Sequence, residues 1–112
     1  MELKLTPRFL QNGQRFFGPG VAELLERVRE HRSLRAAAAS MEMAYSKAWR
    51  IIHEAEEGFG FRLLDSTIGG RHGGGASLTP EGLRLLEAYD TFCTGLHDAA
   101  DKLFQQEFSE FL

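Results

Sequence analysis

The spacing of hydrophobic residues predicts three helices in the first half of the chain. Apolar side chains recur at helical intervals over residues 21–31, with charged residues between them. Ser33 is a suitable N-cap for a second helix over residues 34–40, whose centre is a run of alanines. After a short break, a third helix is predicted from residue 44 or 45 to about residue 57. The alanines allow close approach of a neighbouring helix, so the second and third helices are predicted to form a helix-turn-helix.

Shorter patterns predict a β-hairpin on each side of these helices. Residues 3–17 alternate imperfectly around Asn12-Gly13, a dipeptide that tolerates the positive φ angles of a tight turn. Residues 61–68 are rich in apolar and β-branched side chains and predict a strand. Residues 76–78 predict its partner strand across a glycine-rich turn. The second hairpin follows the third helix, which is the position of a wing.

The end of the chain predicts one long helix. Thr79-Pro80-Glu81 combines an N-cap, a proline at the first helical position and an acid in the first turn. If unbroken to Leu112, the helix is about 50 Å long at 1.5 Å per residue, which is longer than a small body can cover. Its hydrophobic residues are spaced alternately by four and three, which favours a helix seam between two chains. The residues predicted to form this dimer interface are Leu85, Tyr89, Phe92, Leu96, Ala99, Leu103, Phe104 and Phe108.

Together these elements predict a mainly α fold with a small β component. The expected architecture is a winged helix-turn-helix with an N-terminal β-hairpin and a long C-terminal dimerisation helix. The DNA-binding body is expected over residues 1–78, with the hairpin at 3–17, the helix-turn-helix at 33–58 and the wing at 61–78. The dimerisation helix is expected over residues 79–112.

Composition and charge narrow the class of protein. The chain has 112 residues, of which 43% are hydrophobic and 26% charged, as in an ordinary soluble domain. The net charge is −3, but residues 1–78 carry 11 basic against 9 acidic side chains, whereas residues 79–112 carry 2 against 7. A lone cysteine, Cys93, suits a reducing compartment, and no apolar run is long enough for a membrane span. We therefore expect a cytoplasmic protein with a mildly basic body and an acidic tail.

A winged helix-turn-helix places its second helix in the major groove of double-stranded DNA. The start of the third helix offers side chains for base edges, and Ser33 and Arg35 are candidates for backbone contacts. Arg71 and His72 lie at the tip of the wing, where glycines allow close approach to the minor groove or a phosphate. The candidate DNA-binding residues are Ser33, Arg35, Ala44, Tyr45, Ser46, Lys47, Arg50, Arg71, His72 and Gly73.

Other chemistry is not indicated. The four histidines are scattered without metal-ligand spacing, and the sequence shows no recognisable pairing of a nucleophile with a base or of two carboxylates. The glycine run at 69–75 lacks the pattern of a nucleotide-binding loop. We therefore expect no metal, no cofactor and no catalysis.

Several side chains allow a purely structural interpretation. For Trp49 we favour packing between helices, whereas Tyr45 fits core packing and DNA contact equally well. Lys47 and Arg50 belong to a solvated helix face in most proteins, and only their place in this motif favours DNA. Cys93 is expected to be a small buried residue of the last helix.

Three segments resemble the DNA-binding domain of ModE-type molybdate-responsive regulators, which is related to the LysR-type domain. They are Ser33-Leu-Arg-Ala-Ala-Ala38, Met43-Ala-Tyr-Ser-Lys-Ala-Trp49 and Gly69-Gly-Arg-His-Gly-Gly-Gly-Ala-Ser-Leu-Thr-Pro-Glu-Gly82. The resemblance covers about residues 18–92 and implies DNA binding and dimerisation. It does not extend to molybdate-binding modules, so molybdate binding is not expected from this chain alone. The family's frequent basic residue near Ser66 is also missing.

The function expected on these grounds is that of a homodimeric transcription regulator on a pseudo-palindromic operator. A protein-interaction module, which docks a separate sensor chain through the Phe-rich end of the last helix, is the alternative. A regulator that senses a metabolite at the dimer seam is a third possibility.

Overall fold

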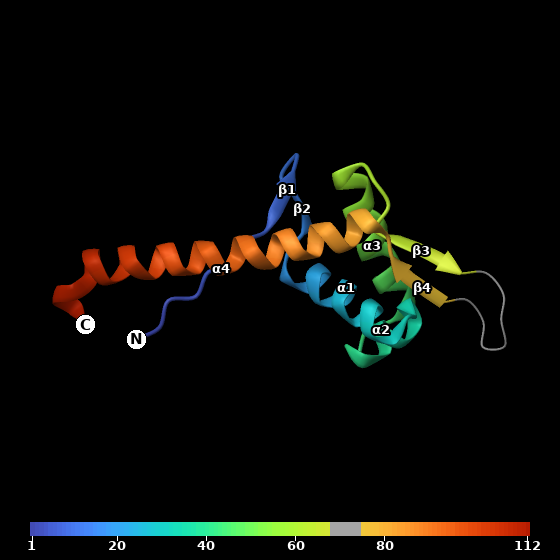
Figure 1. The fold of residues 1–112 in the computed structure, drawn as a ribbon, viewed down its shortest axis with the longest axis horizontal. Coiled ribbons are helices and arrows are strands. Elements are labelled where there is room, and N and C mark those ends of the chain that lie inside the picture. Colours follow the sequence, from blue (N-terminus) through green and yellow to red (C-terminus); the bar gives the residue numbers. More distant parts are fainter. Residues whose placement is uncertain (68–74) are drawn as a thin grey trace.

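A computed structural model of the chain describes residues 1–67 and 75–112 (Figure 1). The elements follow in the order β1 (Phe9–Gln11), β2 (Gln14–Phe17), α1 (Pro19–His31), α2 (Leu34–Ser40), α3 (Tyr45–Phe59), β3 (Leu64–Thr67), β4 (Gly75–Leu78) and α4 (Pro80–Phe108), with a terminal 3₁₀ turn at Ser109–Phe111. The strands form two separate antiparallel hairpins, β1–β2 and β3–β4. This arrangement confirms the predicted winged helix-turn-helix with an N-terminal hairpin and a long final helix.

The N-terminal hairpin turns at Asn12 and Gly13, both with positive φ (54° and 79°), as the dipeptide predicts. It is shorter than the expected 3–17, because β1 begins only at Phe9. Pro7 has no N–H to donate to a strand ladder, which explains the late start. The preceding residues run instead as an extended tail along α4 (Figure 1). The Tyr89 hydroxyl donates to the Pro7 carbonyl at 2.7 Å, and a ring nitrogen of His97 lies 3.2 Å from the Leu3 carbonyl.

The core lies between α1, the helix-turn-helix and the first half of α4. Its largest fully buried side chains are Phe17, Leu24, Leu25, Leu63 and Val28. Aromatic rings join the hairpin to the helices: Phe17 packs edge-to-face against Phe59 and Tyr89, with ring centroids 5.3 and 5.1 Å apart. The hairpin is thereby fixed to the body.

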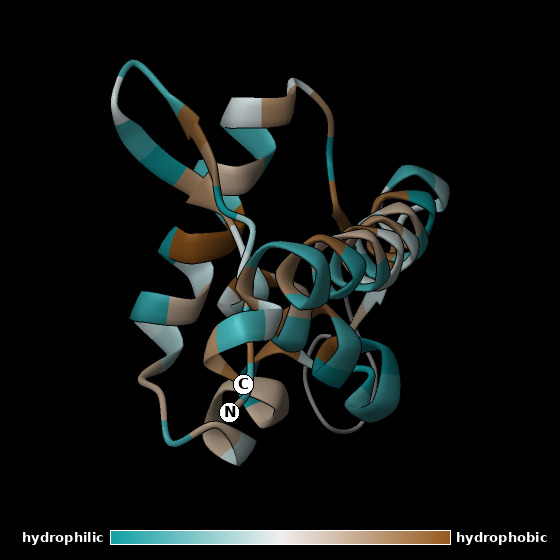
Figure 2. Cartoon of the chain, turned by 90° about the vertical axis from the view of Figure 1, so that its left-hand side faces the viewer, coloured by the Kyte–Doolittle hydropathy of each residue, from teal (hydrophilic) through white to brown (hydrophobic). Residues whose placement is uncertain are grey.

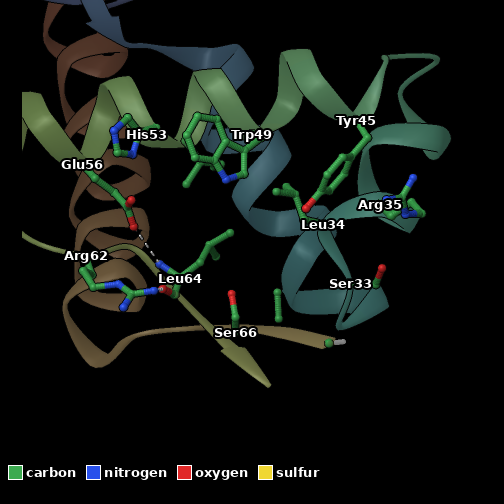
Figure 3. A pocket seen from close by; sticks show the side chains of 13 residues that line it. Ser33, Leu34, Arg35, Tyr45, Trp49, His53, Glu56, Arg62, Leu64 and Ser66 are labelled. Carbon is green, nitrogen blue, oxygen red and sulfur yellow. Dashed lines mark hydrogen bonds between the residues drawn. The ribbon is translucent and has the colours of Figure 1, made fainter. Parts of the chain in front are cut away.

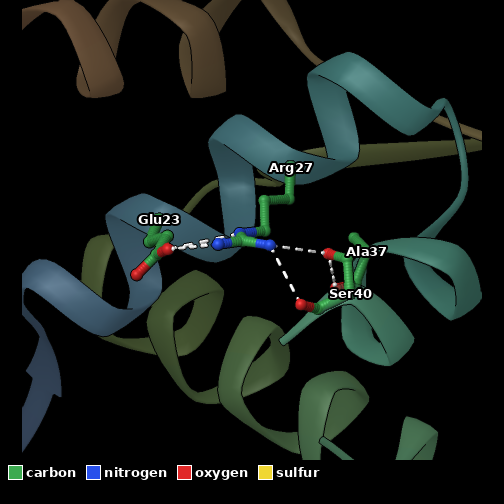
Figure 4. Close-up of polar contacts among 4 residues, drawn as sticks. All are labelled: Glu23, Arg27, Ala37 and Ser40. Carbon is green, nitrogen blue, oxygen red and sulfur yellow. Dashed lines mark hydrogen bonds and ion pairs between the residues drawn. The ribbon is translucent and has the colours of Figure 1, made fainter. Parts of the chain in front are cut away.

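Arg27 holds α1 against the end of α2 (Figure 4). Its guanidinium pairs with Glu23 at 2.7 Å and donates to both the carbonyl and the hydroxyl of Ser40, at 3.0 and 3.1 Å. The Ser40 hydroxyl in turn donates to the Ala37 carbonyl at 2.7 Å. A cation at the C-terminal carbonyls of a helix is favourable. This network fixes the angle at which α2 presents the following turn and α3.

The first turn of α4 is attached to the wing. The Thr79 hydroxyl accepts from the Gly82 amide at 2.9 Å and donates to the Arg62 carbonyl at 2.6 Å. A Cβ at Gly82 would lie only 2.4 Å from the Leu63 carbonyl oxygen, so glycine is required for this close approach. The predicted N-cap is confirmed, and it also ties the helix to the residues just before β3.

The second half of α4 projects beyond the body, and the molecule measures 62 × 28 × 24 Å (Figure 1). Gly95 does not interrupt the helix. Viewed down its axis, α4 carries both hydrophobic and hydrophilic residues (Figure 2). Its large apolar side chains beyond the body are exposed: Phe92 by 50%, Leu103 by 60% and Phe108 by 48%. No helix in the described part of the chain is both long and apolar enough to cross a membrane.

Candidate nucleic-acid interface

The turn between α2 and α3 exposes the start of α3. Glu42 adopts a left-handed conformation (φ 55°), and the Met43 amide donates back to the Ala38 carbonyl at 2.9 Å. Ala48, Ile52 and Ala55 bury one side of α3 against the body. Opposite them, the first turns of α3 face solvent.

The predicted contact residues of α3 share this exposed region. Ala44, Tyr45, Ser46, Lys47 and Arg50 are all exposed, Tyr45 by 40%. Arg50 and Ser46 lie almost opposite the buried stripe at 100° per residue. The structure therefore leaves all five predicted side chains accessible around the start of α3, with Ser46 and Arg50 directed away from the body.

Trp49 belongs to this surface, and the interpretation of Trp49 as a core residue is wrong. It is 53% exposed and stacks on His53, with ring centroids 4.8 Å apart. Trp49 lies on the helix about 60° from Ile52, at the edge of the buried stripe. Whether an edge residue is covered depends on the element beside it, and the wing leaves this edge open. Trp49 is therefore a large apolar side chain that is accessible to a partner, which the sequence did not predict.

A hollow of about 440 Å³ lies between α2, α3 and the wing (Figure 3). Trp49 and Tyr45 line it from α3, and Arg62 and Ser66 line it from the wing. The guanidinium of Arg35 lies over the Tyr45 ring, 4.2 Å from its centroid. This cation–π contact orients Tyr45 and places the Arg35 charge beside the start of α3.

Two sets of hydrogen bonds attach the wing to the helices, one to α3 and one to the end of α1. The Glu56 carboxylate accepts from the amides of Leu63 and Leu64, at 2.8 and 3.4 Å. The Ala76 amide on β4 donates to the Arg32 carbonyl at 3.0 Å. The strands pair antiparallel from Leu64 opposite Leu78 to Thr67 opposite Gly75. The predicted contacts of Arg71, His72 and Gly73 lie outside the described residues.

The charges of α3 run against its own dipole. Lys47 and Arg50 lie in the first turns, whereas Glu54, Glu56 and Glu57 lie towards the C-terminus. A helix is stabilised by the opposite arrangement, with acids at its positive N-terminus and bases at its C-terminus. Local stability therefore does not explain the two cations. Together with the free amides of the first turn they give this end of α3 a positive potential, which suits an anionic partner.

Ser33 has a structural role, because its hydroxyl accepts from the Ala36 amide at 3.1 Å as the N-cap of α2. The hydroxyl is only half-buried and lines the hollow, so its position remains compatible with a backbone contact. The structure thus gives Ser33 a capping role, and its DNA contact stays a prediction.

On α4, one residue of the predicted dimer interface needs correction. Tyr89 is buried in this chain, only 6% exposed, where the rings of Phe9 and Phe17 cover it. Burial raises the pKa of Tyr89 to about 12, and hydrogen bonding to Cys93 adds to the shift. Leu85 is half-buried against the core as well. The accessible part of the seam therefore begins at Phe92. It continues through Leu96, Ala99, Leu103, Phe104 and Phe108.

Cys93 is half-buried beside the core and unpaired. Within residues 1–67 and 75–112, no three His, Cys, Asp or Glu side chains come together in a way that could hold a metal ion.

The geometry described so far is that of a winged helix-turn-helix: a presented second helix, a hairpin beside it, and a long helix leading away. Residues 21–83 match the family described as bacterial regulatory helix-turn-helix proteins of the lysR family. The chain therefore belongs to this family.

Relatives and a solved structure agree with this assignment. The chain is 33% identical over 88 residues to the molybdenum transport protein ModE of Herbaspirillum seropedicae. These residues make up 79% of this chain and 30% of that protein. It is 31% identical over 102 residues to the DNA-binding transcriptional dual regulator ModE of Escherichia coli K12. These residues make up 91% of this chain and 38% of that protein. The crystal structure of ArgP from Mycobacterium tuberculosis shares the fold, with a TM-score of 0.53, 23% identity, and coverage of 79% of this chain and 31% of that one. The chain thus spans about a third of the length of these proteins.

Proposed function

We propose that the chain binds double-stranded DNA sequence-specifically as a homodimer and regulates transcription without catalysing a reaction. The observation that supports this most directly is the accessible start of α3. It combines Ser46, Lys47 and Arg50 with the half-exposed rings of Tyr45 and Trp49. A helix with these side chains fits the major groove of B-DNA, where cations and hydroxyls reach base edges and apolar groups reach thymine methyls.

Different parts of the interface have different roles in this proposal. Ser46 and Arg50, opposite the buried stripe, read base edges. Arg35, held over the Tyr45 ring, contacts the phosphate backbone. The wing contacts the minor groove or the backbone, with Arg71, His72 and Gly73 at its tip. The acidic α4 leads away from this surface, so its charge does not oppose the approach of DNA. A protein that binds bacterial operators in this way acts in the cytoplasm.

The second half of α4 supports the dimer part of the proposal. Phe92, Leu96 and Leu103 are 50%, 37% and 60% exposed and share one face of a helix that projects past the body. Exposed apolar faces of this kind mark interaction surfaces. A second copy of α4, packed antiparallel or parallel, would bury these side chains and relate two α3 helices by a two-fold axis.

Sedimentation of two variants tests the dimer. Leu96→Glu adds a charge to the apolar face and should convert a dimer at micromolar concentration into a monomer. Thr91→Glu, an exposed position on the opposite side of the same helix, adds the same charge and should leave the dimer intact. A monomeric wild-type chain would contradict the proposed dimer.

Selection of bound duplexes from a randomised pool tests sequence-specific binding by a two-fold dimer. We expect enrichment of an inverted repeat whose half-sites are about one helical turn apart. Failure to enrich any sequence would contradict the proposal and would favour docking of another protein through the Phe-rich end of α4.

A further inference from the structure

The N-terminal hairpin lies beside α3 on the side away from the wing, and its position suggests a second function. We propose that hairpin β1–β2 is a second wing, which binds a phosphate of the DNA backbone through Arg8, Arg15 and Lys47. The inference rests on the proposed function, because it extends the DNA-binding surface beyond α3 and the wing β3–β4.

The two sides of α3 face two different hollows. Tyr45 and Trp49 line the hollow shared with the wing, whereas Lys47, Ile51 and Glu54 line a shallow groove shared with the hairpin. This groove has a volume of about 310 Å³ and lies between β2, the start of α1 and α3. An α-helix in the major groove has one phosphate backbone on each side. The wing lies on one of these sides, and the groove of the hairpin lies on the other.

The groove is basic. Arg8 and Arg15 line it from the N-terminal segment and Lys47 lines it from the first turn of α3, against a single acid, Glu54. All three cations are exposed. Among the residues that the structure describes, none of the three is paired with a carboxylate, and Arg8 makes only a long 3.5 Å hydrogen bond to the Thr6 carbonyl. Their positive charge is therefore available to a phosphate, and arginine suits phosphate through its several donors.

Packing on both sides of β2 fixes the backbone that carries Arg15. A Cβ at Gly58 would lie 2.1 Å from the Phe16 ring, so β2 packs on α3 through a contact that only glycine permits. On the other side of the strand, Phe17 is buried and stacks with Phe9, with ring centroids 5.6 Å apart. Arg15 is thus carried on a strand anchored on both sides. Because this backbone is already ordered, binding a phosphate requires ordering only of the side chain, which lowers the entropic cost of the contact.

Arg15→Gln tests the proposal, because it removes one exposed charge without touching the packing of Phe16 or Phe17. DNA affinity should fall about three- to tenfold on the selected operator and on random duplex alike, since a phosphate contact carries no sequence information. The slope of log affinity against log salt should become shallower by about 0.9, the value for one phosphate. Glu54→Gln removes the single acid of the groove and should act in the opposite direction, with affinity about twofold higher.

Lys102→Gln is the matched control, because it removes the same charge from the projecting half of α4 and should leave affinity and slope unchanged. Thermal unfolding of each variant verifies that the fold is retained. If the unmodified chain binds its operator and Arg15→Gln has the same affinity and the same salt slope, the proposal that the hairpin is a second wing is overturned, and the proposed function is not. If the unmodified chain shows no salt-sensitive DNA binding, the proposed function falls, and the role of the hairpin falls with it.

Discussion

Replacement of Trp49 by alanine distinguishes the proposed role of this residue in DNA binding from a role in the core. A tryptophan side chain buries up to about 250 Å². At 53% exposure, roughly 130 Å² of Trp49 remains available for contact with DNA. At about 25 cal/mol per Å², complete burial of this surface is worth at most about 3 kcal/mol. Because ordering and desolvation reduce such values, we expect a loss of about 1–2 kcal/mol, a complex weaker by about five- to thirtyfold.

The stability of the same variant should change much less than that of a core variant. A buried tryptophan costs about 3–5 kcal/mol when truncated to alanine. Trp49 is only about half covered by its own chain, so we expect a loss below about 2 kcal/mol. Ile52→Ala, one turn along the same helix and 5% exposed, provides the contrast and should lose about 2–5 kcal/mol.

Urea denaturation measures the stability, and fluorescence anisotropy on the selected duplex measures the affinity. Both use one fixed protein concentration, because the proposed dimer would make the apparent stability depend on concentration. Two results together would contradict a contact between Trp49 and DNA: Trp49→Ala is destabilised as strongly as Ile52→Ala, and its folded fraction binds DNA with wild-type affinity. Trp49 would then be a packing residue whose exposure has no role in recognition.

Other variants test single parts of the account. Arg50→Ala should lose about 1–3 kcal/mol of affinity, mostly on the selected operator. Lys47→Ala should lose the same affinity on the operator as on random duplex, because we place Lys47 on a phosphate. Binding titrations on both duplexes compare the two variants. Thr79→Val removes the N-cap and the bond to the Arg62 carbonyl, and should cost about 2 kcal/mol in urea denaturation. Thr79→Ser should recover most of this loss, and no difference between the two would exclude the cap. The pKa of Tyr89 is raised to about 12 in the folded chain. Its hydroxyl therefore stays protonated at pH values where a tyrosine of the unfolded chain, with a pKa near 10, ionises. Stability should therefore fall between pH 10 and 12, and Tyr89→Phe should reduce this fall; identical pH profiles would contradict the burial of the hydroxyl.

The helices and turns were predictable because each has a local signal. Asn12-Gly13 determines a tight turn, Thr79-Pro80 starts α4, and the run of alanines in α2 permits close packing whatever surrounds it. These signals depend on backbone geometry and on hydrogen bonds a few residues away. They hold in the folded chain, with boundaries shifted by a few residues.

The environment of individual side chains was less predictable, because it depends on elements distant in sequence. Tyr89 has the spacing of the dimer seam, but Phe9 and Phe17 from the N-terminal segment cover it. Trp49 has the spacing of a core residue, but the wing leaves it open. Arg15 gave no signal as a single arginine in a hairpin, and only the packing of Phe16 on Gly58 places it beside Lys47. The distribution of charge along α3 was available in the sequence and would have drawn attention to its basic start.

The proposed function requires that the basic, aromatic start of α3 binds DNA and distinguishes sequences. Fluorescence anisotropy of the purified chain on its selected operator and on a scrambled duplex, across a series of salt concentrations, tests this claim most directly. We expect tighter binding to the operator. Its affinity should fall steeply as salt rises, with a slope of log affinity against log salt that is proportional to the number of phosphates contacted. Equal affinity for both duplexes, or binding to neither at low salt, would contradict it.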